Sequence, residues 1–333
     1  MNTVIVDKSG IPQAAQCLAA GGLVVFPTET VYGLGGNAFD ECAIDKIYEA
    51  KGRPSDNPLI VHIADMAALD ELAEYVPDYA WQLIDLYWPG PMTLIFKKKS
   101  QVIDRVTAGM DTVAVRYPSN GIAQQLIRES GVYVAAPSAN LSGSPSPTVA
   151  RHVIDDLNGR VDYIIDGDGC EIGLESTVID ASGEHPIILR PGAITIEMLK
   201  AVDSAATTDK CAVSKTQKPR CPGMKYTHYS PKANVVVVCG DSNSRTRYIS
   251  EKLNEHSNCG VLTYCGGEYK NAAFVVNAGD SMVQYAQGLF YNLRLFDEHG
   301  VDTVYAEFCI EGGIGEAVKN RLYKAAGYNI IEV

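Results

Sequence analysis

The chain has 333 residues, a length that favours two domains, and 46% of them are hydrophobic. Its net charge of -12 argues against a general nucleic-acid binder, because phosphate contacts supply most of that affinity. The sequence predicts neither a membrane span nor a signal peptide, so we expect a cytoplasmic protein. Nine cysteines without a Cys-x-x-Cys pair predict reduced thiols rather than a zinc site or a disulfide framework.

The first two hundred residues alternate apolar strand-like runs with helical patterns. Strands are predicted over 22–27, 58–63, 92–96, 112–116, 132–136, 163–165, 176–180 and 187–189. Helices are predicted over 40–51, with Asp40 as N-cap, and over 66–75, 78–87, 120–129 and 195–202. Because strands outnumber helices, we expect an α/β domain on a twisted, partly antiparallel sheet.

A change of composition marks the predicted end of this domain. Residues 203–218 lose hydrophobic periodicity and gain Ser, Thr and Lys, and residues 206–233 hold six Lys and Arg against one acidic residue. The run 220–231 is too aromatic and too rich in proline for an ordinary flexible tether. It is typical either of a packed, ordered linker or of a lid over the cleft of the first domain.

The last hundred residues alternate more regularly. Strands are predicted over 235–239, 260–264, 273–277 and 303–306, and helices over 244–255, 282–298 and 317–325. This alternation predicts a small Rossmann-like α/β domain. We therefore expect a catalytic domain over 1–205, a linker or lid over 206–233 and a C-terminal domain over 234–333.

Two short motifs predict an anion-binding site. Lys51 and Arg53 place two cations one residue apart at the end of a predicted helix, and Ser138 and Asn140 place a hydroxyl and an amide one residue apart after a predicted strand. Two cations with two neutral hydrogen-bonding groups suit the phosphate chain of a nucleotide. The alternative is that the two cations form a solvated helix end, which the helix dipole also favours.

Polar residues at the ends of other predicted strands indicate one shared cleft. The run 27–35 combines two threonines, one carboxylate and several glycines, a mixture that suits a small zwitterion such as an amino acid but also an ordinary capped turn. Arg116 closes an apolar strand and needs an anionic partner, which a substrate carboxylate or an internal acid could supply. The P-loop, Gly-x-Ser-x-Gly and His-Glu-x-x-His motifs are absent from the sequence.

Taken together, these segments resemble the threonylcarbamoyl-adenylate (threonylcarbamoyl-AMP) synthases of the YrdC-type family in their two-domain, long form. The segments that carry the resemblance follow in order at 26–34, 51–54, 57–62, 115–118, 136–143, 175–178, 189–192 and 222–231. The resemblance implies a YrdC-like catalytic domain, an ordered linker and a Rossmann-like C-terminal domain.

The resemblance also implies a reaction and the residues that serve it. L-threonine and bicarbonate would form a carbamate that attacks the α-phosphate of ATP, releasing pyrophosphate, and a separate tRNA threonylcarbamoyl-transferase complex would use the product. The residues matched as catalytic and ATP-binding are Lys51, Arg53, Ser138 and Asn140. Further nucleotide contacts would come from Asn57, Thr112, Ser146, Arg190 and Tyr226, and threonine contacts from Thr30, His62, Arg116 and Ser176.

Mg²⁺ is expected to accompany ATP, held mainly by phosphates and water rather than by protein ligands. We expect no stable nucleic-acid or membrane partner. Two other functions compete with this interpretation. An RNA chaperone would bind with steep salt dependence, and the acidic charge argues against it. A carbamoyl-adenylate enzyme of hydrogenase maturation would carry Cys-x-x-Cys zinc motifs, which this sequence lacks.

Overall fold

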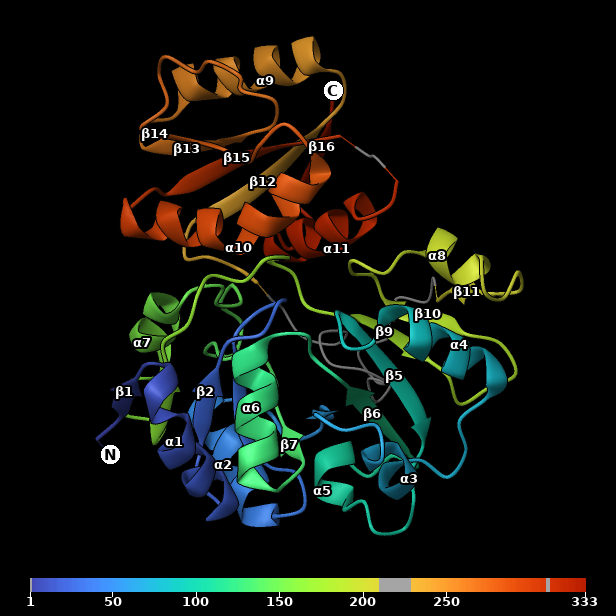
Figure 1. The fold of residues 1–333 in the computed structure, drawn as a ribbon. Helices are drawn as coiled ribbons and strands as arrows, with labels where there is room; N and C mark the ends of the chain where they lie inside the picture. Colours follow the sequence, from blue (N-terminus) through green and yellow to red (C-terminus); the bar gives the residue numbers. More distant parts are fainter. Residues whose placement is uncertain (1, 210–228, 310–311) are drawn as a thin grey trace. The chain divides into compact units, whose positions relative to one another are not determined.

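The computed structural model describes residues 2–209, 229–309 and 312–333 (Figure 1). The chain divides into two compact units. The first comprises Met1–Ser142, Pro147–Glu171 and Glu175–Lys225, and the second comprises Gly143–Ser146, Ile172–Leu174 and Tyr226–Val333. Most of the linker predicted over 206–233 lies outside the described residues. Among the described residues, no helix is both long and apolar enough to cross a membrane.

The first unit is built on a mixed sheet with the strand order β1-β8-β2-β3-β7-β4-β6-β5-β9-β10-β11. The strands are β1 (Val4–Val6), β2 (Val24–Phe26), β3 (Gly33–Asn37), β4 (Ile60–His62), β5 (Met92–Lys97), β6 (Thr112–Arg116), β7 (Val134–Ala135), β8 (Tyr163–Ile165), β9 (Thr177–Asp180), β10 (Ile187–Arg190) and β11 (Thr207–Thr208). Parallel pairs such as β4–β6 and β5–β9 alternate with antiparallel pairs such as β5–β6 and β4–β7. The predicted mixed sheet is confirmed.

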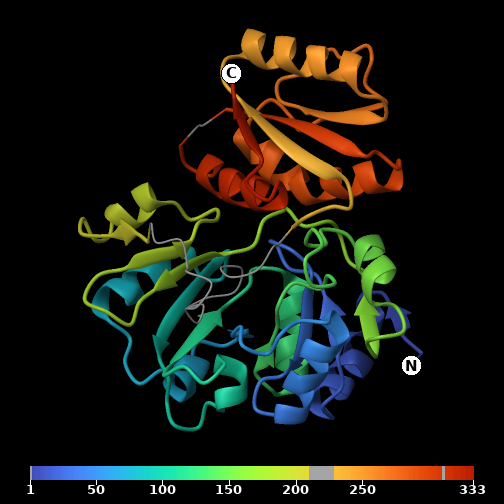
Figure 2. The same cartoon turned by 180° about the vertical axis from the view of Figure 1, so that it is seen from behind.

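Helices cover both faces of this sheet (Figures 1 and 2). They are α1 (Ile11–Ala19), α2 (Glu41–Lys51), α3 (Ala68–Leu72), α4 (Asp78–Tyr87), α5 (Asp104–Thr107), α6 (Gly121–Ser130), α7 (Ala150–Leu157) and α8 (Ile196–Lys200). Helices α1 and α6 pack with Val24 and Phe26 on one face, whereas α2, α3 and α4 pack with Val25 and Leu34 on the other. Successive residues of a strand point to opposite faces, so β2 contributes to both cores.

Strand β3 departs from the prediction, which treated its glycine-rich run as part of a turn. The structure pairs β3 antiparallel with both β2 and β7. A Cβ atom at Gly35 would lie 2.8 Å from side-chain atoms of Phe26 and of Val134, so a larger residue would force neighbouring side chains to shift. Close packing rather than turn formation explains this glycine. The prediction also missed α1, α5, α7, β1 and β11, and helix 66–75 is shorter than expected, because α3 covers only Ala68–Leu72.

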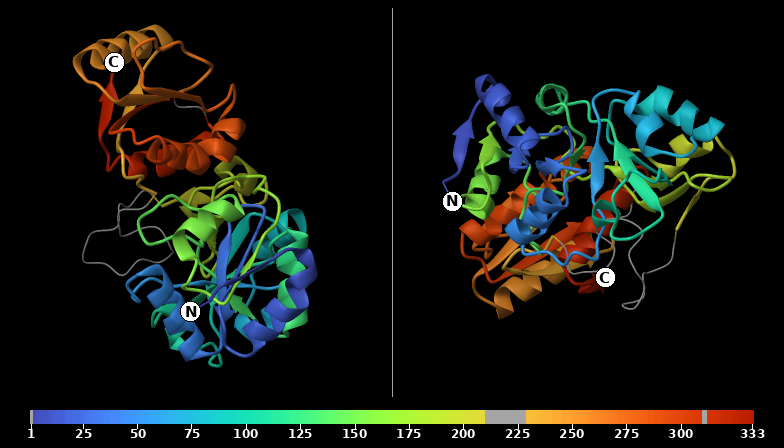
Figure 3. Two further views of the ribbon diagram at one scale, coloured as in Figure 1. Left: turned by 90° about the vertical axis from the view of Figure 1, so that its left-hand side faces the viewer. Right: turned by 90° about the horizontal axis from the view of Figure 1, so that it is seen from below.

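The second unit contains a sheet in which every strand is parallel to its neighbours, with the order β14-β13-β15-β12-β16. Its strands are β12 (Asn234–Cys239), β13 (Cys259–Thr263), β14 (Phe274–Asn277), β15 (Thr303–Phe308) and β16 (Ile330–Glu332). Helix α9 (Ser242–Glu255) covers one face, and α10 (Met282–Glu298) and α11 (Gly315–Ala325) cover the other (Figure 3). This arrangement confirms the predicted Rossmann-like architecture.

Candidate active site

Helix α2 carries Lys51 as its last residue. Asp40 caps the start of the helix by accepting a hydrogen bond from the Cys42 backbone N–H, and Gly52 ends it with a left-handed φ of 61°. The buried Lys51 ammonium donates to the backbone carbonyl of Ser138 and, at 2.6 Å, to that of Asn140. The Lys-x-Arg and Ser-x-Asn motifs, 87 residues apart from Lys51 to Ser138, therefore meet in the folded chain.

The loop that contains Ser138 and Asn140 is held by its own side chains as well as by Lys51. The Ser138 hydroxyl donates to Asn140 Oδ1 at 2.5 Å, and Asn140 Nδ2 donates to the Leu141 carbonyl at 2.8 Å. The Ser142 backbone N–H donates to the carbonyl of Lys51 at 2.9 Å, so a backbone hydrogen bond also joins this loop to the end of α2. This loop therefore has a defined conformation in the protein alone.

Burial and the neighbouring Arg53 cation lower the pKa of the Lys51 ammonium well below its ordinary value. The carboxylates of Asp156 and Glu175 oppose this shift. A lysine in this environment gains from any further negative charge nearby. The interpretation of Lys51 as a solvated helix end is therefore wrong, because its side chain is buried and hydrogen-bonded.

Three more of the predicted nucleotide residues lie at the amino end of strand β4. Arg53 lies 3.5 Å from the Pro58 carbonyl, and the buried Asn57 precedes that proline. Strands β4 and β6 are parallel, with Ile60 opposite Ala114, so the first residue of β6, Thr112, lies at the same edge of the sheet as Asn57. Neither polar atom of the Asn57 side chain has a hydrogen-bond partner among the described residues, which is the state expected of a buried amide that binds a ligand.

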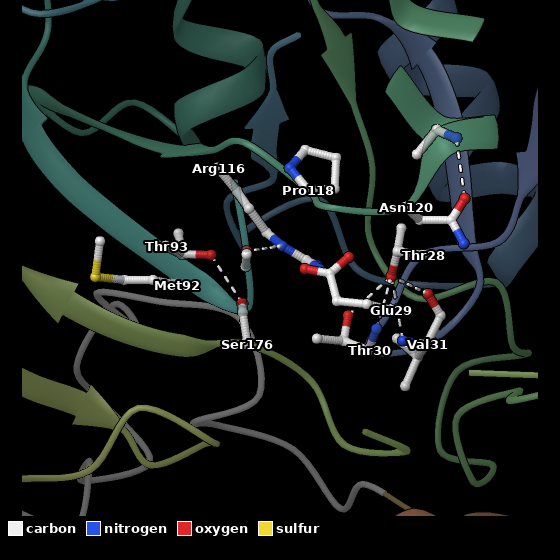
Figure 4. A network of polar contacts seen from close by, with 12 residues as sticks. Thr28, Glu29, Thr30, Val31, Met92, Thr93, Arg116, Pro118, Asn120 and Ser176 are labelled. Atoms are coloured by element: carbon white, nitrogen blue, oxygen red, sulfur yellow. Dashed lines mark hydrogen bonds and ion pairs between the residues drawn. The ribbon is translucent and has the colours of Figure 1, made fainter. Parts of the chain in front are cut away.

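A second group of polar residues lies around the carboxyl end of β6 (Figure 4). The Arg116 guanidinium and the Glu29 carboxylate point toward each other, with Nη2 2.8 Å from Oε1, and both side chains are 5% exposed. Thr28 shapes the loop that carries Glu29, because its hydroxyl donates to the Val31 carbonyl at 2.6 Å and lies 2.9 Å from the Thr30 hydroxyl. The structure thus brings Thr30 and Arg116 to the same place.

Ser176 joins this second group through its neighbours. Its hydroxyl lies 2.8 Å from that of Thr93, and Thr93 is paired with Arg116 across strands β5 and β6. Arg190 donates to the Ser176 carbonyl at 3.0 Å and to its hydroxyl at 3.2 Å. Arg190, which we predicted as a nucleotide contact, is therefore placed beside a predicted threonine contact.

Two predicted nucleotide residues fall outside these two groups. Ser146 is buried and belongs to the segment Gly143–Ser146 of the second unit. Tyr226 lies outside the described residues, together with most of the run 220–231. The roles of both residues stay predictions.

His62 is buried at the end of β4, with Nδ1 3.1 Å from the Ile60 carbonyl. Burial, reinforced by the Arg116 cation, lowers the pKa of His62 from 6.5 to about 3. The imidazole is therefore neutral at physiological pH. A neutral ring beside a guanidinium can hydrogen-bond a ligand but adds no charge to the site.

The low pKa of His62 predicts a loss of stability in mild acid. Between pH 6.5 and about 3 the unfolded chain binds one proton more than the folded chain at this residue, so the free energy of unfolding falls as the pH drops below 6.5. His62 should contribute a loss of about 2 kcal/mol between pH 7 and pH 5. Urea unfolding at both pH values should show this loss in the native chain but a smaller loss in His62→Gln. The control is His256→Gln, which changes an exposed histidine and should show the full loss. Equal losses in all three proteins would contradict the assignment.

Two residues of the site were not assigned from the sequence. In the sequence Glu29 is only one carboxylate in a polar run, and Thr93 lies inside the apolar strand β5, where no sequence signal distinguishes it. Their positions next to Arg116 and Ser176 come from pairing between distant strands. Among the described residues no group of three or more His, Cys, Asp or Glu side chains is placed to hold a metal ion.

Comparisons with known proteins cover both units. A model of the Sua5/YciO/YrdC family, described as telomere recombination, matches residues 16–192, and one described as the threonylcarbamoyl-AMP synthase C-terminal domain matches residues 194–327. The threonylcarbamoyl-AMP synthase of Bacillus subtilis is 48% identical over 96% of this chain and 94% of its own length. The corresponding protein of Pyrococcus abyssi is 47% identical over 98% and 97%. The solved structure of P. abyssi Sua5 complexed with L-threonine matches with a TM-score of 0.94 and 44% identity, covering 100% of both chains.

Proposed function

Because the chain belongs to the Sua5/YciO/YrdC family, in its two-domain form, we propose that it is a threonylcarbamoyl-AMP synthase. L-threonine and bicarbonate form a carbamate with release of water, the carbamate oxygen attacks the α-phosphorus of ATP, and pyrophosphate leaves. The enzyme is then a nucleotidyltransferase, and a tRNA threonylcarbamoyl-transferase complex takes its product for tRNA modification in the cytoplasm. The observation that carries the proposal is the contact between the two predicted ATP motifs at Lys51.

The chemistry of nucleotidyl transfer suits the residues at this site. Such a transfer needs positioning and neutralisation of phosphate charge more than a protein nucleophile. Lys51 and Arg53 supply positive charge, while Ser138, Asn140 and Asn57 supply neutral hydrogen-bonding groups. Because Lys51 is already desolvated, its charge acts on the phosphates through a medium of low dielectric constant.

We propose that Mg²⁺ enters with ATP. Mg²⁺ usually keeps several waters and binds phosphates with one or two carboxylates at most. When bound, the ion would neutralise the phosphates, and Asp156 or Glu175, whose carboxylates act electrostatically on Lys51, would offer it water-mediated contacts.

The threonine subsite is proposed around Arg116. The guanidinium would bind the α-carboxylate, and the hydroxyls of Thr30 and Ser176 would hydrogen-bond the polar groups of the amino acid. The Arg116 cation acts electrostatically on His62, and the neutral imidazole would offer the amino acid a further hydrogen bond.

One assay tests the proposed function. The full chain is incubated with ATP, Mg²⁺ and bicarbonate, and pyrophosphate release is followed with and without L-threonine. We expect release to require threonine and bicarbonate together, and to fall strongly when valine replaces threonine. Release that ignores the amino acid would contradict the proposal.

A further inference from the structure

The pair formed by Glu29 and Arg116 is unusual in how little else it binds. Glu29 is 4% exposed, yet neither oxygen of its carboxylate accepts a hydrogen bond from any described residue, and the Arg116 Nη2 lies 2.8 Å from Oε1. An ionised carboxylate offers about four acceptor positions. Burying it with most of them unused is costly, so the site holds acceptor capacity that the protein alone does not use.

Arg116, in contrast, has hydrogen-bond donors that the described residues leave unused. Apart from the ion pair, its guanidinium makes one long hydrogen bond among the described residues, from Nε to the Gly90 carbonyl at 3.4 Å. A guanidinium has five N–H donors in a planar fork. The pair therefore presents unused donors beside unused acceptors, within one buried place.

Most of the groups around this pair are neutral, the exception being Arg190, whose guanidinium hydrogen-bonds Ser176. Thr28 and Thr30 contribute hydroxyls from the loop that carries Glu29, and Thr93 of β5 and Ser176, just before β9, contribute two more (Figure 4). Burial keeps the nearby Cys170 a neutral thiol by raising its pKa to about 12. A ligand with one charge of each sign would match both members of the Glu29–Arg116 pair, whereas a singly charged ligand would pair with one member at the expense of the other.

We propose that Glu29 is the acceptor for the α-ammonium of the amino-acid substrate, so that Glu29 and Arg116 together form a receptor for a free α-amino-acid zwitterion. This inference rests on the proposed function and adds the residue that selects a free amino group. The substrate carboxylate takes donors of Arg116 while the ammonium takes acceptors of Glu29, and the charges of site and ligand sum to zero. A carboxylic acid without the amino group would instead bring its negative charge next to Glu29.

The test compares two ligands with two proteins. Binding of L-threonine and of 3-hydroxybutyrate, which lacks the amino group, is measured by calorimetry on the native full chain and on Glu29→Gln. We expect Glu29→Gln to weaken threonine binding by about 10- to 100-fold, the range for a lost charge-assisted hydrogen bond. Binding of 3-hydroxybutyrate should be unchanged or stronger, because the repelling carboxylate is gone.

A purely structural role of Glu29 gives a different pattern. If Glu29 only orients Arg116, both ligands lose affinity by the same factor, and that result overturns the inference while the proposed function stands. If threonine does not bind the native chain at all, both are overturned. The exposed Glu74→Gln serves as matched control and should leave both affinities within twofold.

A second variant guards against loss of folding in Glu29→Gln. Glu29→Asp keeps a negative charge opposite Arg116, but its side chain is shorter by one methylene. Its preference for threonine over 3-hydroxybutyrate should lie between those of the native chain and Glu29→Gln. An unchanged preference in a folded Glu29→Asp, together with equal losses for both ligands, would also overturn the inference.

Discussion

Replacing Lys51 by alanine should lower the threonine-dependent release of pyrophosphate by on the order of 10²-fold or more. The substitution removes a buried lysine from the place where the two motifs that we propose to bind ATP meet. It also removes one hydrogen bond to each of the Ser138 and Asn140 carbonyls, which should lower the free energy of unfolding by about 1–3 kcal/mol. Turnover is therefore measured at a temperature where thermal unfolding curves show both proteins to be folded.

The matched control lies on the same helix. Lys46 is exposed, and its ammonium donates to the Gly21 carbonyl at 2.8 Å, so Lys46→Ala also removes a lysine that bonds a backbone carbonyl. We expect turnover of Lys46→Ala to stay within threefold of the native chain. If Lys51→Ala changed turnover by less than about threefold as well, the proposed role of Lys51 in neutralising phosphate charge would be wrong.

Replacing Arg116 by methionine should damage stability and activity through separate causes. Glu29 would be left as a buried carboxylate without a counter-charge, which typically costs about 3–5 kcal/mol. The double variant Arg116→Met with Glu29→Gln removes both charges and should recover most of that loss. Threonine-dependent turnover should remain low in both variants, because neither can bind the substrate carboxylate through a guanidinium.

An exposed ion pair provides the comparison. Arg105 pairs with Asp45 at the surface, with side chains 39% and 55% exposed, and Arg105→Met should cost about 0–1 kcal/mol with normal turnover. Chemical denaturation and pyrophosphate release are measured on all four proteins. Recovery of turnover in the double variant would show that Arg116 serves only to balance Glu29.

Local features of the fold were predictable from the sequence because their causes are local. Asp40 and Gly52 bound α2 by capping and by left-handed backbone geometry, and both residues are visible in the sequence at the expected spacing. Helix α10 (Met282–Glu298) was predicted with its observed bounds for the same reason, since its apolar periodicity is long and uninterrupted. Strand β3 was not, because the reason for its glycines is the proximity of Phe26 and Val134.

The site was predictable as a set of residue types but not as an arrangement. The sequence indicated that Arg116 needs an anion, yet it left open whether a substrate or an internal acid supplies it. The structure provides the internal acid, Glu29, which the chain order separates from Arg116 by several strands. Thr112 and Arg116 lie at opposite ends of β6, as the strand predicted over 112–116 implies, but the strands that pair with β6 were not predicted. Such relations depend on register, which local patterns do not encode.

Strands β4 and β6 run side by side, with Asn57 and Thr112 at one end and His62 and Arg116 at the other. Strand β4 has three residues and so spans about 10 Å. If nucleotide and amino acid occupy the two ends as proposed, the length of this short strand fixes the distance between the two reactants. Its length cannot change by even one residue without turning His62 to the opposite face, so insertions here should be far more damaging than substitutions.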